Sequence, residues 1–101
     1  MITLSAIEDE EGTVVATFQK SAASLLASTH SARGARQNIW DDLYRTRKGK
    51  YVIYHANQWQ GARTWYELIS LSRAAQFAAE HAPDQDNLPA DLRAEIEAME
   101  I

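Results

Sequence analysis

The chain has 101 residues, no cysteine and a formal net charge of −4. This length is typical of one domain with a core of its own, so we expect a single domain over residues 1–101. The absence of cysteine excludes disulfides, thiolate metal sites and a cysteine nucleophile, and it fits a reducing compartment.

Targeting signals are not expected. Residues 1–7 carry no basic side chain ahead of their apolar ones, which argues against a signal peptide. No apolar run in the sequence reaches the roughly 20 residues that a membrane span needs. We therefore expect a cytoplasmic protein with no membrane partner.

The first predicted element is a β-hairpin with residues 8–12 as its loop. If Ile7 pairs with Thr13, alternation along the strands brings six apolar side chains to one face. Gly12 suits the positive φ angle that ends such a loop. The aligned side chains are those of Ile2, Leu4, Ala6, Val14, Ala16 and Phe18.

Residues 21–36 give a weaker pattern. Ser21 can cap a short helix that buries Leu25 and Leu26, although serine and threonine inside the segment count against a helix. Residues 30–36, with Gly34 among them, are typical of a loop.

A second hairpin is predicted from residues 43–47 and 50–56, joined by a two-residue turn at Lys48-Gly49. This register pairs Asp42 with His55. It places one group of side chains on each face of the hairpin: Tyr44, Thr46, Tyr51 and Ile53 on the first, and Leu43, Arg45, Arg47, Lys50, Val52 and Tyr54 on the second.

The remaining elements are one strand and two helices. Residues 57–63 form a polar loop around Trp59, and residues 64–69 alternate as a strand. Ser70 suits the N-cap of a helix over residues 71–82, with a buried stripe of Leu71, Ala74, Ala75, Ala78 and Ala82.

After a linker over residues 83–87, Pro89 suits the first position of a last helix. Its apolar stripe is Leu88, Leu92, Ile96 and Met99, and its opposite face is acidic through Asp91, Glu95, Glu97 and Glu100. The predicted fold class is α+β. We expect an antiparallel sheet of about five strands, from two hairpins and one strand, with two or three helices, the last two C-terminal.

Charge is segregated along the chain. Residues 33–63 hold seven basic side chains against two acidic ones, whereas the segments on either side are acidic. Basic residues interleaved with aromatic ones can bind an acidic protein or a single-stranded nucleic acid. Most of these aromatic side chains are expected in the sheet core, and Trp59 is equally compatible with exposure and with packing over a sheet edge.

A catalytic interpretation has less support. A carboxylate beside an imidazole, as predicted for Asp42 and His55, can hold the imidazole in the tautomer that acts as a general base. The pattern places no nucleophile beside this pair. His55, Arg45 and Tyr54 could together cleave RNA without a metal, which gives a ribonuclease-like alternative. The three histidines lack metal-ligand spacing, so we expect no metal and no cofactor.

Two segments, Leu43-Tyr44-Arg45-Thr46 and Gln58-Trp59-Gln60-Gly61, carry a resemblance to other proteins. With Gly49 and Tyr51 between them and Ile69-Ser70 before an alanine-rich helix, residues 43–82 resemble small proteins of bacterial genomes, phages and other mobile elements. The resemblance implies an accessory protein that a mobile element uses against a host defence such as CRISPR. It implies no catalytic residue.

The sequence therefore predicts a non-enzymatic, protein-binding accessory protein. The partner would be engaged by the basic-aromatic hairpin, the Trp59 loop or the acidic last helix. The sharpest form is an inhibitor of a nucleic-acid-guided defence complex, in which an acidic face such as that of the last helix can occupy a nucleic-acid channel. Single-stranded nucleic-acid binding by residues 33–63 is the first alternative. The candidate partner-binding residues are Arg45, Arg47, Lys48, Lys50, Tyr54, Trp59, Arg63, Asp91, Glu95 and Glu97.

Overall fold

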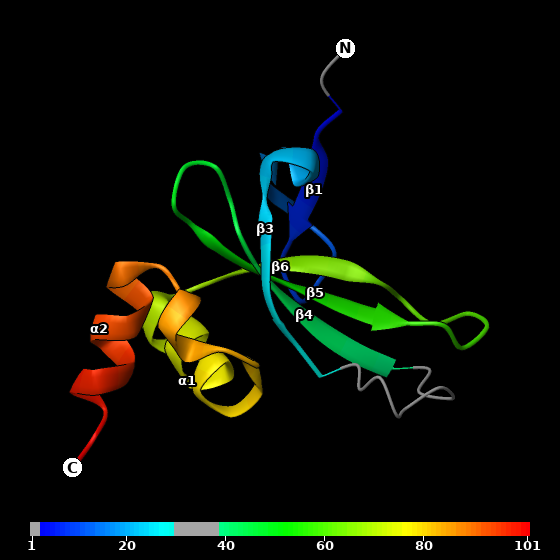
Figure 1. The fold of residues 1–101 in the computed structure, drawn as a ribbon. Helices are drawn as coiled ribbons and strands as arrows, with labels where there is room; N and C mark the ends of the chain where they lie inside the picture. The colour runs from blue at the N-terminus through cyan, green and yellow to red at the C-terminus, as the bar shows by residue number, and fades with distance from the viewer. Residues whose placement is uncertain (1–2, 30–38) are drawn as a thin grey trace.

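A computed structural model of the chain describes residues 3–29 and 39–101. Within these residues the fold has one six-stranded mixed sheet and two α-helices (Figure 1). The strands are β1 (Ser5–Glu8), β2 (Val14–Phe18), β3 (Ser24–Ser28), β4 (Ile39–Arg45), β5 (Tyr51–Asn57) and β6 (Trp65–Ile69). The helices are α1 (Leu71–His81) and α2 (Ala90–Ala98), and short 3₁₀ turns lie at Lys20–Ala22 (η1) and Gln85–Asn87 (η2). Neither α-helix in the described ranges has the length and apolar character needed to cross a bilayer.

The α+β class and the two C-terminal helices are confirmed, and the details of the sheet differ from the prediction. The strand order is β2-β1-β6-β5-β4-β3, with β1 parallel to β6 and every other pair antiparallel. The helix considered for residues 21–29 is wrong for most of its length, because Ser24–Ser28 pairs with β4 as β3. The loop predicted at residues 30–36 and the basic residue Arg36 lie outside the described residues.

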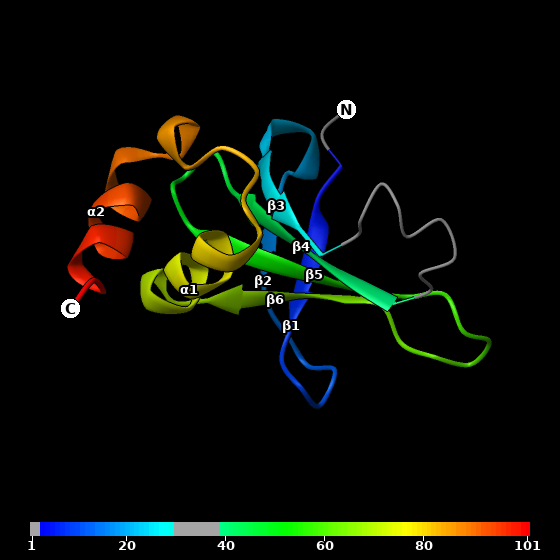
Figure 2. The ribbon, with the colours of Figure 1, turned by 60° about the horizontal axis from the view of Figure 1, so that its bottom comes forward.

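The sheet is strongly curled, as the crossing directions of its strands show in Figures 1 and 2. Strands β2 and β3 are its two edges, yet only residues 19–23 connect them. A flat sheet of this strand number would separate its edges by about 24 Å, which exceeds the reach of so short a connection containing a 3₁₀ turn. Curling brings the end of β2 and the start of β3 within reach of this connection, and it leaves Phe18, Val52 and Ile7 in a small core on the concave side.

The register predicted for the first hairpin is wrong. Its strands pair Glu8 with Val14 and Ile7 with Ala16, and Val15 is the extra residue of a β-bulge. The Asp9 carboxylate accepts hydrogen bonds from the backbone N–H groups of Glu11 and Thr13, and this cap sets the loop. The predicted positive φ of Gly12 is confirmed at 88°.

The register of the second hairpin is also shifted by one residue. The turn has three residues, Arg47 to Gly49, because Thr46 pairs with Lys50 through a backbone N–H···O bond of 2.8 Å. Gly49 is at φ 81°, as expected for the glycine that closes such a turn. The shift pairs His55 with Asp41 and not with Asp42. It also exchanges faces: Arg45 now shares a face with Tyr51, Ile53 and Leu43, and Tyr44 shares one with Val52 and Tyr54.

The helices pack on the convex face and close the main core. Ser70 caps α1 by accepting a hydrogen bond from the Arg73 N–H, as predicted. The buried stripe of α1 faces Leu43, Ile53 and Ile69 of the sheet. Pro89 lies just before α2 and not within it, and its carbonyl accepts from the Arg93 N–H. Leu88 and Leu92 are buried in the same core, so the last helix packs on the domain itself.

The first prediction concerns Gly49. We expect Gly49→Val to lower the free energy of unfolding by about 1 kcal/mol or more, because a side chain at φ 81° is strained and would meet Arg45. Lys48→Val is the matched control, since no described non-glycine residue has a positive φ. Thermal denaturation compares the variants, and an unchanged melting temperature for Gly49→Val would contradict the turn assignment.

The second prediction concerns the attachment of α2. Leu92 is 0 % exposed, whereas Met99 at the end of the same apolar stripe is 37 % exposed. Leu92→Ala should therefore destabilise the domain by about 2–5 kcal/mol, and Met99→Ala by less than about 1 kcal/mol. Chemical denaturation measures both, and equal effects would show that α2 does not dock as described.

Candidate functional site

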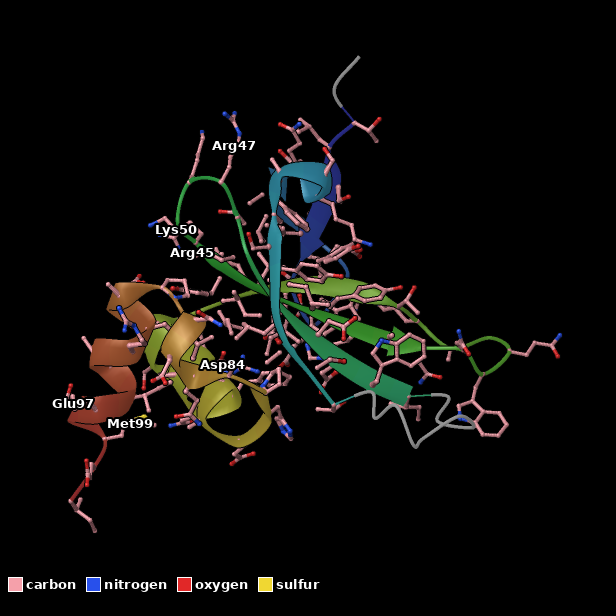
Figure 3. All side chains as sticks on the ribbon, viewed as in Figure 1. Arg45, Arg47, Lys50, Asp84, Glu97 and Met99 are labelled. Atoms are coloured by element: carbon pink, nitrogen blue, oxygen red, sulfur yellow. The ribbon has the colours of Figure 1, made fainter. Side chains whose placement is uncertain are left out.

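Four basic residues that the sequence predicts to bind a partner lie together at the turn between β4 and β5. Arg47, Lys48 and Lys50 are exposed, and Arg45 is half-buried behind them, next to Gly49. Figure 3 shows Arg47 projecting from the tip of the hairpin, with Lys50 and Arg45 closer to the sheet. The local cause is the three-residue turn, which keeps these side chains in one short, solvent-facing segment.

This basic turn forms one wall of a groove of about 890 Å³. The other walls are the start of α1 and the end of β2. The groove exists because β1 pairs with β6 at one position, Ile7 with Tyr66, within the described residues. Beyond that crossing the two strands diverge, and the end of β6 has no neighbouring strand on this side.

The floor of the groove is apolar. Leu4 and Leu68 line it and are 57 % and 46 % exposed, with the buried side chains of Ile7 and Phe18 beneath. Large aliphatic side chains that remain half-exposed in a concave site are typical of a binding surface.

Electrostatically the groove is asymmetric. In the part of the chain that the structure describes, no carboxylate forms an ion pair with Arg47, Lys48 or Lys50. Asp91 also lines the groove, but its Oδ1 accepts hydrogen bonds of 2.9 Å from the Tyr51 hydroxyl and from the Leu92 N–H. Burial, with the Asp91 hydrogen bond second, raises the pKa of the Tyr51 phenol. Among the described residues, the cations at Arg47, Lys48 and Lys50 therefore keep their positive charge without a carboxylate partner.

The other predicted partner-binding residues are not part of this groove. Trp59 is exposed in the loop between β5 and β6, at the opposite end of β5 from the basic turn, about 20 Å along the strand. Arg63 is held at the first hairpin loop: its guanidinium donates to the carbonyls of Asp9 and Glu10, both at 2.8 Å, and pairs with Glu8. The single basic-aromatic block expected for residues 33–63 is thus divided.

Tyr54 lies on the concave face of the sheet, in a cluster that the sequence did not indicate. Its ring stacks on Tyr66 with centroids 4.7 Å apart, and the Lys20 ammonium lies 5.7–5.8 Å from the rings of Tyr44 and Tyr54. The hydrogen bond with Tyr66 is the main cause that raises the pKa of Lys20. Lys20 is distant in sequence from these tyrosines, and only the curl of the sheet brings it over them.

Glu95 and Glu97 lie on α2, away from the groove lining. Figure 3 shows Glu97 near the C-terminal end of α2, well away from Arg47 at the tip of the hairpin. Of the acidic residues predicted to bind a partner, Asp91 therefore lines the groove with the basic turn, whereas Glu95 and Glu97 do not.

His55 lies between two carboxylates on the convex face. Its Nδ1 is 2.9 Å from Asp41 Oδ1, its Nε2 is 2.8 Å from Glu67 Oε1, and its ring packs on Trp65. Glu67 also pairs with Arg73 at 3.1 Å. Burial acts to raise the pKa of Glu67, but the hydrogen bonds from His55 and Arg73 outweigh it and hold that pKa below its ordinary value.

This arrangement does not assemble the predicted catalytic groups. Both ring nitrogens of His55 are occupied by carboxylates, Tyr54 is on the other face, and Arg45 is at the far end of β5. Asp42, the partner expected for His55, instead accepts hydrogen bonds from Trp40 Nε1 at 3.2 Å and from the Ser28 hydroxyl. Among the described residues no group of histidine and acidic side chains has an arrangement that could hold a metal ion.

Comparison with protein-family models, with curated proteins and with solved structures gives no match for this chain. The groove and its charge therefore carry the functional proposal.

The third prediction concerns Glu67. Because its pKa is lower in the folded state, the ionised carboxylate stabilises the fold above its ordinary value of 4.5, and this contribution is lost as the pH falls through the folded pKa. Glu67→Gln should cost roughly 1–3 kcal/mol at pH 7, and less at pH 3. Denaturation at both pH values measures this, with Glu80→Gln, an exposed acid beside His81, as control. A cost for Glu67→Gln that does not change with pH would contradict the ionised hydrogen-bond chain.

Proposed function

We propose that this chain is a non-enzymatic protein-binding module whose groove receives an acidic, partly apolar segment of another protein. One observation carries the proposal: the groove combines a half-exposed aliphatic floor at Leu4 and Leu68 with a rim of cations, Arg47, Lys48 and Lys50, that form no ion pair with any described residue. A ligand that matches both features has apolar side chains to cover the floor and carboxylates to face the rim.

The two features contribute in different ways. Covering the floor gains roughly 1.5–3 kcal/mol for each leucine-sized side chain that the partner buries. The exposed rim cations add less affinity, but they steer an acidic partner toward the groove and disfavour a basic one. The floor therefore supplies most of the affinity, and the rim supplies charge selectivity.

Nucleic acid is the less favoured partner for this groove. Single-strand binding combines cations with exposed aromatic rings that stack on bases. In the groove lining, the aromatic side chains are Phe18 and Tyr51, and both are buried. Trp59 lies at the other end of β5, and the whole chain is acidic.

The narrower hypothesis, inhibition of a nucleic-acid-guided defence complex, stays a prediction that rests on the sequence resemblance. The groove proposal is compatible with it, because an acidic-apolar segment of such a complex is one form of the proposed ligand.

The fourth prediction tests the groove with a synthetic peptide in which glutamate and leucine alternate over about seven residues, the length of an ordinary strand. We expect isothermal titration calorimetry to detect binding that weakens with salt. Reversal of Arg47, Lys48 and Lys50 to glutamate should weaken it roughly tenfold or more, since several rim charges are lost together.

Two matched controls separate the contributions of charge and floor. Leu68→Ser should weaken binding, whereas Leu25→Ser, at a leucine on β3 that is 57 % exposed and lies outside the groove, should not. Arg93→Glu alters an exposed cation outside the groove and should leave affinity unchanged. Preference for a lysine-leucine peptide, or tighter binding of a single-stranded oligonucleotide that the triple reversal removes, would contradict the proposal.

A further inference from the structure

We infer that the partner segment binds as an extended strand that pairs with the free edge of β2, which makes it an additional strand of the sheet. This inference rests on the proposed function and specifies the conformation of its ligand. Recognition by strand addition joins backbone hydrogen bonds with alternating side-chain contacts.

The first observation is how β2 borders the groove. Four consecutive residues, from Ala16 to Gln19, line it. Successive side chains of a strand point to opposite faces, so a site on one face would be lined by alternate residues only. Consecutive lining indicates that the groove runs along the edge of β2, where the backbone itself is accessible.

The second observation is that this edge is open. Strand β2 is the terminal strand of the sheet, and in the described ranges it pairs with β1 alone. Residues 14–18 contain neither the charged side chains nor the proline with which proteins commonly block strand edges. The β-bulge at Val15 lies outside the groove lining, so it leaves the half of β2 that borders the groove regular.

The alternation of hydrogen-bonded and non-hydrogen-bonded pairs in the β1–β2 hairpin shows which backbone groups of β2 are available to a ligand. The Asp9 N–H donates to the Thr13 carbonyl at 3.0 Å, and hydrogen-bonded pairs then alternate along the hairpin. After the bulge, this alternation places Thr17 in a non-hydrogen-bonded pair with Ala6. The N–H and C=O of Thr17 therefore point away from β1, toward the position that an added strand would occupy.

The partner chemistry follows from this geometry. In an added strand, every second side chain turns to one face, so alternate apolar residues can reach the floor at Leu4 and Leu68. Carboxylates between them or at the end of the strand remain near the basic turn. A segment with acidic and apolar residues in alternation fits both requirements, whereas an amphipathic helix of the same composition cannot pair with the Thr17 backbone.

Amide hydrogen exchange with the intact chain tests strand addition directly. With the alternating glutamate-leucine peptide at saturation, we expect the Thr17 N–H to exchange at least about tenfold more slowly than in the free protein, because it becomes hydrogen-bonded. The Leu25 N–H, on the other edge strand, should keep its exchange rate. Unchanged exchange at Thr17 under saturation would overturn strand addition while leaving the groove proposal intact.

Two further comparisons remove the remaining alternatives. Thr17→Pro deletes the outward N–H and should reduce affinity at least about tenfold, whereas Thr17→Ala keeps it and should bind normally; proline is tolerated at an edge whose N–H faces outward. A peptide of the same composition, rearranged to helical spacing, should bind more weakly than the alternating one. Equal affinities for the two peptides, or equal loss in both Thr17 variants, would overturn strand addition. Failure of both peptides to bind would overturn the groove proposal as well.

Discussion

Ile7 and Tyr66 form the pair that joins the N-terminal hairpin to the rest of the sheet, and the position of that hairpin depends on it. Ile7 is buried, and the Tyr66 ring packs edge-on against Phe18 and stacks on Tyr54. The crossing is thus held mainly by side-chain packing on the concave face. Because strand pairing stops there, β1 and β6 separate, and the groove lies between the end of β2, the end of β6 and the basic turn.

The two faces of the sheet have different roles. The convex face is covered by α1 and α2, where alanines of α1 allow close approach and Leu88 and Leu92 complete the core. The concave face has no α-helix over it in the described ranges, and Ala23 of the short β2–β3 connection packs at its small core. Figure 2 shows both α-helices on the other side of the sheet from this connection's strand ends. The curl that this short connection requires brings Lys20 over the tyrosine rings and the end of β2 close to the basic turn. The curl of the sheet therefore determines both the fold and the groove.

The polar groups on the convex face occupy both ring nitrogens of His55. Asp41, His55, Glu67 and Arg73 form a continuous chain of hydrogen bonds across β4, β5, β6 and α1. Each half-buried charge in this chain has a partner, which offsets the cost of its partial burial. The cations at the β4–β5 turn have no such partner among the described residues, and this contrast distinguishes a structural charge cluster from a surface available to a ligand.

The sequence by itself determined the local features: positive φ at Gly12 and Gly49, the Ser70 cap, the alternation of β6, and the apolar stripes of both helices. Each of these features is set by residues that are close in the chain, so a short stretch of sequence is enough to predict it. It also placed Arg47, Lys48 and Lys50 at one turn. The tertiary structure decided the hairpin registers, because a slip of one residue exchanges the faces of a strand and nearby residues fit both alternatives. It likewise decided that residues 24–28 form β3, that β1 runs parallel to β6, and that Leu4, Thr17 and Leu68 share one groove. Each of these depends on contacts between distant segments, whose geometry is set by the curl of the whole sheet.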